Sequence, residues 1–553
     1  MAKFTEIDLS DDRLISIASD MVDNHKYIEA LKMLNKNEGI SGSDEDALML
    51  YAEIYDDMGL YEKSVNGWFK YLDYAGAEDL SDCYEGLAVG FMNLGDEHFS
   101  AYYYNKLLLE TDELDPVSRE EIVKEFLSSN SDNPLKFVYP PELADFSEVF
   151  SEGVSLMKSG EYEKAIEEFD KVADGNPKYL SARNYVAMCK IIADRTEEAA
   201  EECLYILNRD PDNVQALSTL AAVRSEEGKR EESVVLAKKL LKIDVTEPDE
   251  IYKIATVCCE NKMHAEAYET FMRLPAEFDY DLNVLYFKAV SAFNCGKNEE
   301  CLEAFDRLVT IYPDAVTARY YYNYVRGLTE KDERTELSYF YRLPAEVRES
   351  SLKILAAYVR LSRTAAKKLA REIDLTACIK WCFDEVEGGS GELQLLACHA
   401  AVKAELDELV RGFLLNAFLD DRIKIEILTA LAERNAFDCF GVVICNVYRR
   451  ITTQPLQTGR VKRSKFVRAY ARLFAHFAIL DSNYGASFAD AAERLYDTLE
   501  NENRLDCADD NDALCIAVYK YSGVNAAEIN EEDLYGFFEA SKERVNKILG
   551  LGD

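Results

Sequence analysis

The chain has 553 residues and a formal net charge of −40. A chain this acidic repels nucleic acid and anionic membranes at long range and favours basic or apolar partners. The simpler explanation is that the acidity keeps a large open array soluble. Its 11 prolines and 25 glycines are few for this length, as expected of a mostly helical protein. No apolar stretch approaches the roughly 18 residues that span a bilayer, and the N-terminus has no signal-peptide core. We therefore expect a cytoplasmic protein without a membrane span.

Residues 1–128 show a faint pattern of paired helices. Each pair places a small residue on its first helix, a turn after it, and an aromatic or apolar residue on the second helix. The pattern falls on Tyr27, Ala30 and Leu34, on Ala52, Gly59, Tyr61 and Trp68, and on Ala88, Gly95 and Tyr104. We expect a degenerate array of helical hairpins here. A polar joint follows over 129–145, where Pro140 and Pro141 exclude a helix.

Residues 146–328 repeat every 34 positions. Pairs 34 residues apart are Pro177 and Pro211, Ala165 and Ala199, Phe169 and Cys203, and Gly153 and Ala187. Small residues let two helix axes approach closely, aromatic residues fill the space between them, and proline ends a helix. A fixed order of such residues at this period is typical of stacked helix–turn–helix repeats.

The segment from Gly160 to Pro177, GEYEKAIEEFDKVADGNP, resembles the tetratricopeptide repeat. The resemblance covers about residues 14–328. It implies an all-α solenoid in which the first helices of successive hairpins line a concave groove that holds protein segments. Members that clamp a C-terminal carboxylate use lysine, asparagine and arginine at set groove positions. Only Asn184 fits that set here, so we do not expect this kind of ligand.

The resemblance places other side chains along the groove. Acidic residues fall at one end, on Asp46, Glu53, Asp56 and Asp57, and aromatic residues at the other. Aromatic anchors are the usual hot spots of peptide recognition, although they could also pack between repeats. The predicted partner-binding residues are Asn184, Tyr286, Val290, Phe293, Tyr320, Tyr321 and Tyr324. We expect a protein or peptide partner that is basic, aromatic or apolar.

Residues 335–553 lose the 34-residue period but keep apolar residues at intervals of three and four, which indicates helices. The helices pair at irregular spacing, similar to HEAT-type repeats, and we transfer no function from that likeness. The predicted fold class is all-α throughout, with a hairpin solenoid followed by an irregular helical domain.

One stretch of this region is basic. Between Asp438 and Asp481 there is no acidic residue, and eight basic ones occur: Arg449, Arg450, Arg460, Lys462, Arg463, Lys465, Arg468 and Arg472. We expect an exposed loop that enters a helix near Ser464, with an anion to compensate its charge. The candidates are an acidic surface of the same chain, an acidic partner or second copy, and nucleic acid.

No catalytic motif is present. The sequence has no phosphate-binding loop, dinucleotide fingerprint or nucleophile elbow. Cys378 and Cys382, with Cys398 and His399 further on, could suggest zinc, but the first two lie among apolar residues and are better explained as core thiols. We expect no metal and no cofactor. The favoured hypothesis is a non-catalytic scaffold, with a nucleic-acid or anion-binding regulator and a helical enzyme subunit as alternatives.

Overall fold

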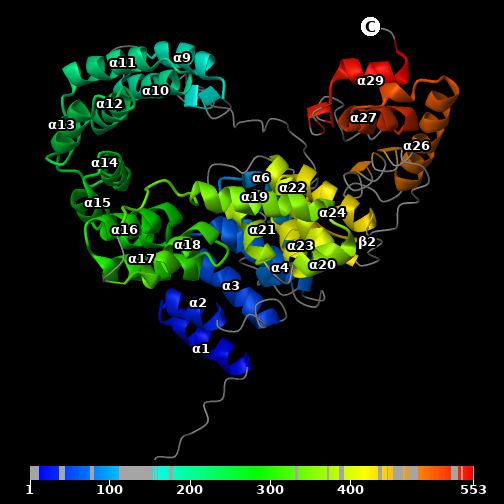
Figure 1. The fold of residues 1–553 in the computed structure, drawn as a ribbon, viewed down its shortest axis with the longest axis horizontal. Helices are drawn as coiled ribbons and strands as arrows, with labels where there is room; N and C mark the ends of the chain where they lie inside the picture. The colour runs from blue at the N-terminus through cyan, green and yellow to red at the C-terminus, as the bar shows by residue number, and fades with distance from the viewer. Residues whose placement is uncertain are drawn as a thin grey trace, which may run out of the picture. The chain divides into compact units, whose positions relative to one another are not determined.

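The fold is taken from a computed structural model, shown in Figure 1. It describes residues 11–35, 44–74, 80–110, 160–172, 179–329, 334–369, 373–384, 391–433, 439–444, 446–452, 484–524 and 540–551, with individual positions in 153–157, 465–473 and 534–538. Among these residues, no helix has both the length and the apolar character that a membrane span needs. Contacts divide the chain into two compact units. Unit 1 comprises residues 1–140 and 343–553, and unit 2 comprises residues 141–342.

Unit 2 is a run of helical hairpins that follow one another in an arc (Figure 1). The two helices of each hairpin pack against each other, and successive hairpins contact one another through first or second helices. The helices are α9 (Tyr162–Asp170), α10 (Tyr179–Ile192), α11 (Thr196–Arg209), α12 (Val214–Glu226), α13 (Arg230–Leu240), α14 (Pro248–Glu260), α15 (His264–Phe271), α16 (Leu282–Asn294), α17 (Asn298–Ile311) and α18 (Val316–Gly327), with the 3₁₀ turn η2 (Ala276–Tyr280) before α16.

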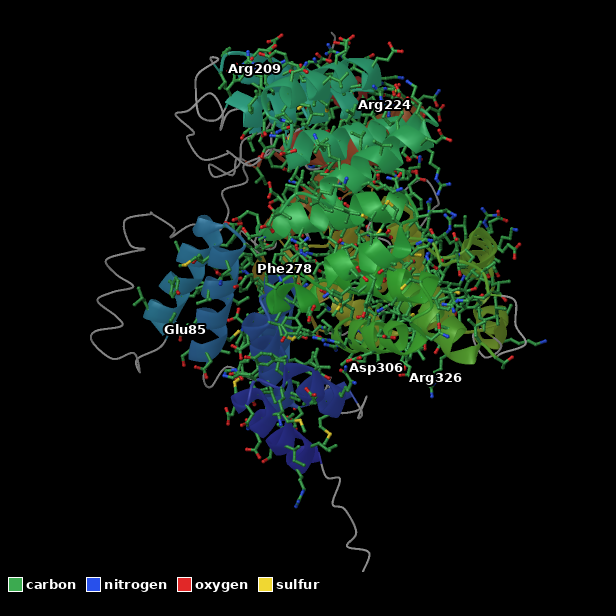
Figure 2. All side chains as sticks on the ribbon, turned by 90° about the vertical axis from the view of Figure 1, so that its left-hand side faces the viewer. Glu85, Arg209, Arg224, Phe278, Asp306 and Arg326 are labelled. Atoms are coloured by element: carbon green, nitrogen blue, oxygen red, sulfur yellow. The ribbon has the colours of Figure 1, made fainter. Side chains whose placement is uncertain are left out.

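The course of the array can be followed in Figure 2. Arg209 on α11 and Arg224 on α12 mark its N-terminal half, and Asp306 on α17 and Arg326 on α18 mark its C-terminal end. Neighbouring helices share small and apolar cores. The ring of Phe169 fills the space beside Gly153, where an added Cβ would lie 2.7 Å from the ring. This close approach explains why the repeat has glycine at that position.

The turn inside each hairpin repeats its backbone conformation every 34 residues. A residue with positive φ occurs at Gly160, Asp194, Gly228, Lys262 and Gly296. This left-handed conformation ends a helix and lets the chain reverse. Glycine adopts it without strain, whereas Asp194 and Lys262 are held there by the surrounding hairpin. The period is therefore a property of the backbone, and it persists where the glycine of the sequence pattern is lost.

The N-terminal part of unit 1 is also a series of hairpins. Its helices are α1 (Asp11–Asp23), α2 (Tyr27–Asn35), α3 (Glu45–Asp57), α4 (Tyr61–Tyr74), α5 (Ser81–Asn93) and α6 (Glu97–Glu110). Positive φ recurs in the turns, at His25, Gly59 and Gly95. The faint pattern of the sequence thus forms the expected hairpins.

The C-terminal part of unit 1 is helical with irregular pairing. Its helices are α19 (Ala345–Arg360), α20 (Arg363–Leu369), α21 (Leu375–Asp384), α22 (Gly391–Ala404), α23 (Asp407–Leu415), α24 (Asp421–Glu433), α26 (Tyr484–Asn501), α27 (Asn511–Ser522) and α29 (Lys542–Leu549), with the short η3 (Leu505–Cys507). The solenoid followed by an irregular helical region is the predicted fold class.

One element departs from the all-helical expectation. Strands β1 (Cys439–Ile444) and β2 (Val447–Thr452) form an antiparallel hairpin in which Ile444 pairs with Val447. Its turn includes Asn446, whose φ is +58°, a conformation that asparagine tolerates better than most residues. The strands are rich in valine, isoleucine and tyrosine, which favour β structure. Each strand has only six residues, and so short a β-branched run did not predict a strand.

The β-hairpin joins the two sequence segments of unit 1. Val443 and Val447 lie in the same apolar core as Trp68 and Phe69 of α4. The hydroxyl of Tyr103 on α6 donates to the carbonyl of Asn446 at 2.5 Å. Residues more than 340 positions apart therefore share one core, which no local sequence pattern could have predicted.

A buried lysine fixes the hairpin to α24. The side chain of Lys424 is fully buried, and its Nζ lies 2.9 Å from Asp421 Oδ1 and 2.6 Å from the carbonyl oxygen of Val443. A buried ammonium group must be paired and hydrogen-bonded to be tolerated. These two contacts supply that pairing, so Lys424 is a structural residue.

Candidate functional site

The candidate site is a face of unit 2 that is covered by an extended segment of the chain itself. We call residues 334–342 the strap. The strap-binding face comprises the residues beneath it on α15, α16 and α18, together with Lys262 in the turn before α15. The strap contains neither helix nor strand. It follows the last helix of the array, and most of its contacts are with the first helices α16 and α18, the elements that the sequence pattern assigned to the groove.

Side chains of the strap-binding face hold the backbone of the strap. Asn294 forms a two-bond amide clamp, since its Nδ2 donates to the carbonyl of Leu337 at 2.9 Å and its Oδ1 accepts from the same residue's N–H at 2.8 Å. The hydroxyl of Tyr286 lies 2.9 Å from the carbonyl of Ser338 and 3.2 Å from that of Phe340. These bonds recognise an extended backbone whatever its side chains are.

The C-terminal half of the strap is held in the same way by α18. The hydroxyl of Tyr321 donates to the carbonyl of Arg342 at 2.8 Å. Near the start of the strap, the hydroxyls of Tyr324 and Thr335 lie 3.1 Å apart. The array therefore contacts the strap along most of its length.

Aromatic packing covers the middle of the strap. Tyr339 stacks on His264, with ring centroids 5.7 Å apart, and its hydroxyl lies 2.8 Å from His264 Nδ1. Tyr341 meets Tyr286 edge-on at 4.9 Å. Burial raises the pKa of both Tyr286 and Tyr339 above the ordinary value, so both phenols stay neutral hydrogen-bonding groups at physiological pH.

Charged groups lie at the start of the strap. Lys262 Nζ is 2.7 Å from Glu336 Oε2, and His264 Nε2 is 3.6 Å from Glu336 Oε1. The hydrogen bond from Lys262 holds the pKa of Glu336 below its usual value. Arg334 donates to the carbonyl of Phe293, and its guanidinium lies 4.3 Å from the centroid of that ring. These contacts fix the register in which the strap lies.

Apart from Asn184, the predicted groove residues lie on α16 and α18, but most of them are not open to solvent. Tyr286 and Val290 are fully buried and Phe293 is 1 % exposed. Tyr321 is also buried, whereas Tyr320 is 36 % exposed. The expectation of an open aromatic groove at these positions needs correction, because the chain's own strap contacts Tyr286, Phe293, Tyr321 and Tyr324.

Asn184, predicted on the same groove, lies on α10, away from the strap contacts. Its Nδ2 donates to Asn213 Oδ1 at 3.2 Å. Asn213 is the N-cap of α12, where its side chain accepts from the N–H of Ala216. In this structure Asn184 therefore supports a helix start.

The basic stretch does not form a single exposed patch among its described residues. Arg472 is buried, 3.1 Å from Glu426 and 2.8 Å from Asp512. Arg449 and Arg450 lie on β2, and Arg450 donates to the backbone carbonyl of Asp73 at 2.7 Å. For Arg472, the compensating anions are carboxylates of the same chain. Lys465 is exposed, and Arg460, Lys462, Arg463, Arg468 and Ser464 lie outside the described residues, as do Pro177 and the joint over 129–145.

Cys378 and Cys382 are buried in α21 as free thiols. Burial raises the pKa of Cys378, and the thiol of Cys382 donates to the carbonyl of Cys378. The two residues thus pack in the core.

Asn294, Lys262, His264 and the strap itself were not predicted from the sequence. The sequence pattern places the end of the array at residue 328 and the start of the C-terminal domain at 335, whereas the strap up to Arg342 belongs to unit 2. A signal was available in LSYFYRL, residues 337–343, where apolar residues at alternate positions follow directly on the last repeat. That alternation indicates an extended segment with one buried face.

The paired helices, their stacking and the 34-residue recurrence of the turn conformation decide the repeat type. The fold is a tetratricopeptide-type helical repeat. No known protein family and no curated protein sequence matches this chain, so the assignment rests on the hairpins of the chain itself.

Several solved structures are similar to this chain, at low sequence identity and low TM-score. A tetratricopeptide repeat protein from Parabacteroides merdae is 16 % identical over 54 % of this chain and 98 % of its own, with a TM-score of 0.22. The TPR2AB domain of yeast Sti1 in complex with an HSP90 peptide is 15 % identical over 47 % and 97 %, with a TM-score of 0.20. The Cut9–Hcn1 assembly of the APC/C is 12 % identical over 98 % and 96 %, with a TM-score of 0.25. These scores are too low to carry an argument about ligands.

Proposed function

We propose that this chain is a non-catalytic scaffold whose tetratricopeptide array holds an extended segment of a protein partner on the strap-binding face. The observation that carries the proposal is the set of bonds to the strap backbone. Asn294, Tyr286 and Tyr321 together bind the N–H and carbonyl of Leu337 and the carbonyls of Ser338, Phe340 and Arg342. A face that satisfies the main chain of one extended segment can satisfy that of another.

The other features of the chain support a protein partner over the alternatives. The net charge of −40 opposes nucleic acid, and the buried Arg472 is already neutralised by Glu426 and Asp512. The aromatic side chains of the face favour a partner with apolar residues. Free buried thiols suit a reducing compartment, so we place the scaffold in the cytoplasm.

The test uses the full chain with its own strap weakened by Tyr339→Ala and Tyr341→Ala. A fluorescent peptide with the sequence of residues 334–344 is titrated by anisotropy. We expect saturable binding that the further change Asn294→Ala weakens at least tenfold, because two bonds to the peptide backbone are lost. Asn298→Ala, at the exposed start of α17, is the matched control. A dissociation constant of about 1 mM corresponds to a binding free energy of about −4 kcal/mol. Absence of binding up to about that peptide concentration would refute the proposed function.

A further inference from the structure

The strap has two chemically different faces. Leu337 is buried and Tyr339 and Tyr341 are partly buried, whereas Ser338 and Arg342 are exposed. Such alternation is the geometry of an extended chain lying on a surface, in which successive side chains point to opposite sides. The outward position between the two tyrosines is Phe340, whose side chain is 77 % exposed. The inward positions therefore carry the recognition, and the outward positions are free to vary.

The inward positions make specific demands on a ligand. The first is filled by Leu337, the second by a phenol that meets His264, and the third by Tyr341 against Tyr286. A carboxylate one residue before the first inward position meets Lys262. The segment that this face accepts thus carries an acidic residue and an apolar residue directly after it. Aromatic residues follow two and four positions after the apolar one.

The strap is held differently from the helices around it. Its described bonds to the array run through side chains, and no strand pairs with it. Its removal would break no helix, but it would uncover Tyr286 and Phe293, which the strap contacts and which are at most 1 % exposed with the strap in place. An uncovered aromatic face of this kind is unfavourable in water. Exchange of the strap for a similar segment is therefore favoured over simple opening.

We propose that the strap is a resident intramolecular ligand, and that the partner is a different protein whose extended segment carries the same alternation and displaces it. This inference rests on the proposed function. A tethered segment competes at an effective concentration of the order of millimolar. The partner must therefore bind more tightly than the strap, or bind where the strap is weakened, and the chain is self-inhibited until it meets such a segment.

The experiment compares one labelled peptide, residues 334–344, on three full-length chains. In the double variant Tyr339→Ala, Tyr341→Ala the strap loses its inward rings. In Phe340→Ala it loses an outward ring of similar size. We expect the double variant to bind the peptide at least tenfold more tightly than the wild type, and Phe340→Ala to bind it as the wild type does. Circular dichroism checks that all three chains keep their helices.

A peptide series tests the recognition pattern on the double variant. A peptide with alanine at the positions of Tyr339 and Tyr341 should lose binding at least tenfold, whereas alanine at the position of Phe340 should change it less than threefold. Equal losses for inward and outward changes would overturn the pattern.

Hydrogen exchange of the Leu337 amide in the wild-type chain gives a readout that needs no variant. Saturation with unlabelled peptide should accelerate this exchange, because the amide is released from Asn294. Equal peptide affinity in the wild type and the double variant, or a protected Leu337 amide at saturation, would overturn the inference and leave the proposed function standing. Failure of the peptide to bind any chain would remove both.

A second copy of the chain is the remaining source of a matching segment. If the wild type dimerises with concentration and the double variant does not, straps are exchanged between copies. Sedimentation velocity separates the cases, and a strap-dependent dimer would overturn the assignment to a different protein.

Discussion

The two units contain similar hairpins, but each unit is stabilised internally by contacts of a different kind. In unit 2 each helix contacts elements that follow closely in the sequence, from α9 through α18. In unit 1 the N-terminal hairpins pack on elements more than 340 residues away, through contacts such as Asn66 with Asn416 and Tyr448 with Asp73. An array stabilised by neighbours tolerates local opening, whereas a core shared by distant segments requires both of them at once.

The largest expected difference concerns the buried lysine of unit 1. Lys424→Met should destabilise unit 1 by about 3–5 kcal/mol, because it leaves Asp421 and the carbonyl of Val443 without their buried partner. Both tryptophans of the chain, Trp68 and Trp381, lie in unit 1, so denaturation followed by tryptophan fluorescence reports this unit alone. Arg422→Met, which removes an exposed pair with Asp420, should shift the midpoint little.

The loss of stability caused by a core substitution in unit 2 should be confined to unit 2. Phe305 is fully buried and lies edge-on to Tyr286. Phe305→Ala should lower the local stability of α16 and α17 by about 3–5 kcal/mol, seen as faster hydrogen exchange in those helices. The tryptophan-detected transition of unit 1 should not move. A parallel loss of stability in both units would show that they unfold as one body and would contradict the independent stabilisation of unit 2.

A smaller effect is expected at the strap. Asn294→Ala removes both bonds to Leu337 and should weaken strap closure by about 1–3 kcal/mol. Exchange of the Leu337 amide should accelerate about 5- to 150-fold, with little change in the amides of α12 and α13. Unchanged protection of Leu337 would mean that the clamp contributes nothing to holding the strap.

The smallest effect is a pH dependence. The pKa of Glu336 lies below its ordinary value of 4.5 because of Lys262. The pair therefore stabilises the strap fully above that value, and the contribution is lost as the pH falls through the lowered pKa. Since Glu336 is 55 % exposed and screened by water and salt, we expect about 0.2–1 kcal/mol. Glu336→Gln should accelerate Leu337 exchange near neutral pH, and this difference from the wild type should shrink as the pH falls through the lowered pKa of Glu336. Glu349→Gln on α19 should leave Leu337 exchange unchanged at either pH.

Sequence reasoning predicted elements with a local cause. The hairpins follow from small and aromatic residues at fixed spacing, and Gly153 shows the cause in its contact with Phe169. The site was predicted only in part. Tyr286, Phe293 and Tyr321 were placed on the right helices, but their cover was not foreseen, because nothing in a helix pattern says which extended segment will lie across it.

The sequence alone determined the helical repeat, its period and the aromatic character of its first helices, because each depends on residues within one or two hairpins. Tertiary structure decided which surfaces stay open. Gly441 illustrates this in unit 1, since an added Cβ would lie 2.0 Å from Asp73 Oδ1, a residue more than 360 positions earlier. The strap illustrates it in unit 2, where Leu337 binds Asn294 from 43 residues away. Contacts over such separations depend on the free energy of the whole packed unit, to which no short pattern gives access.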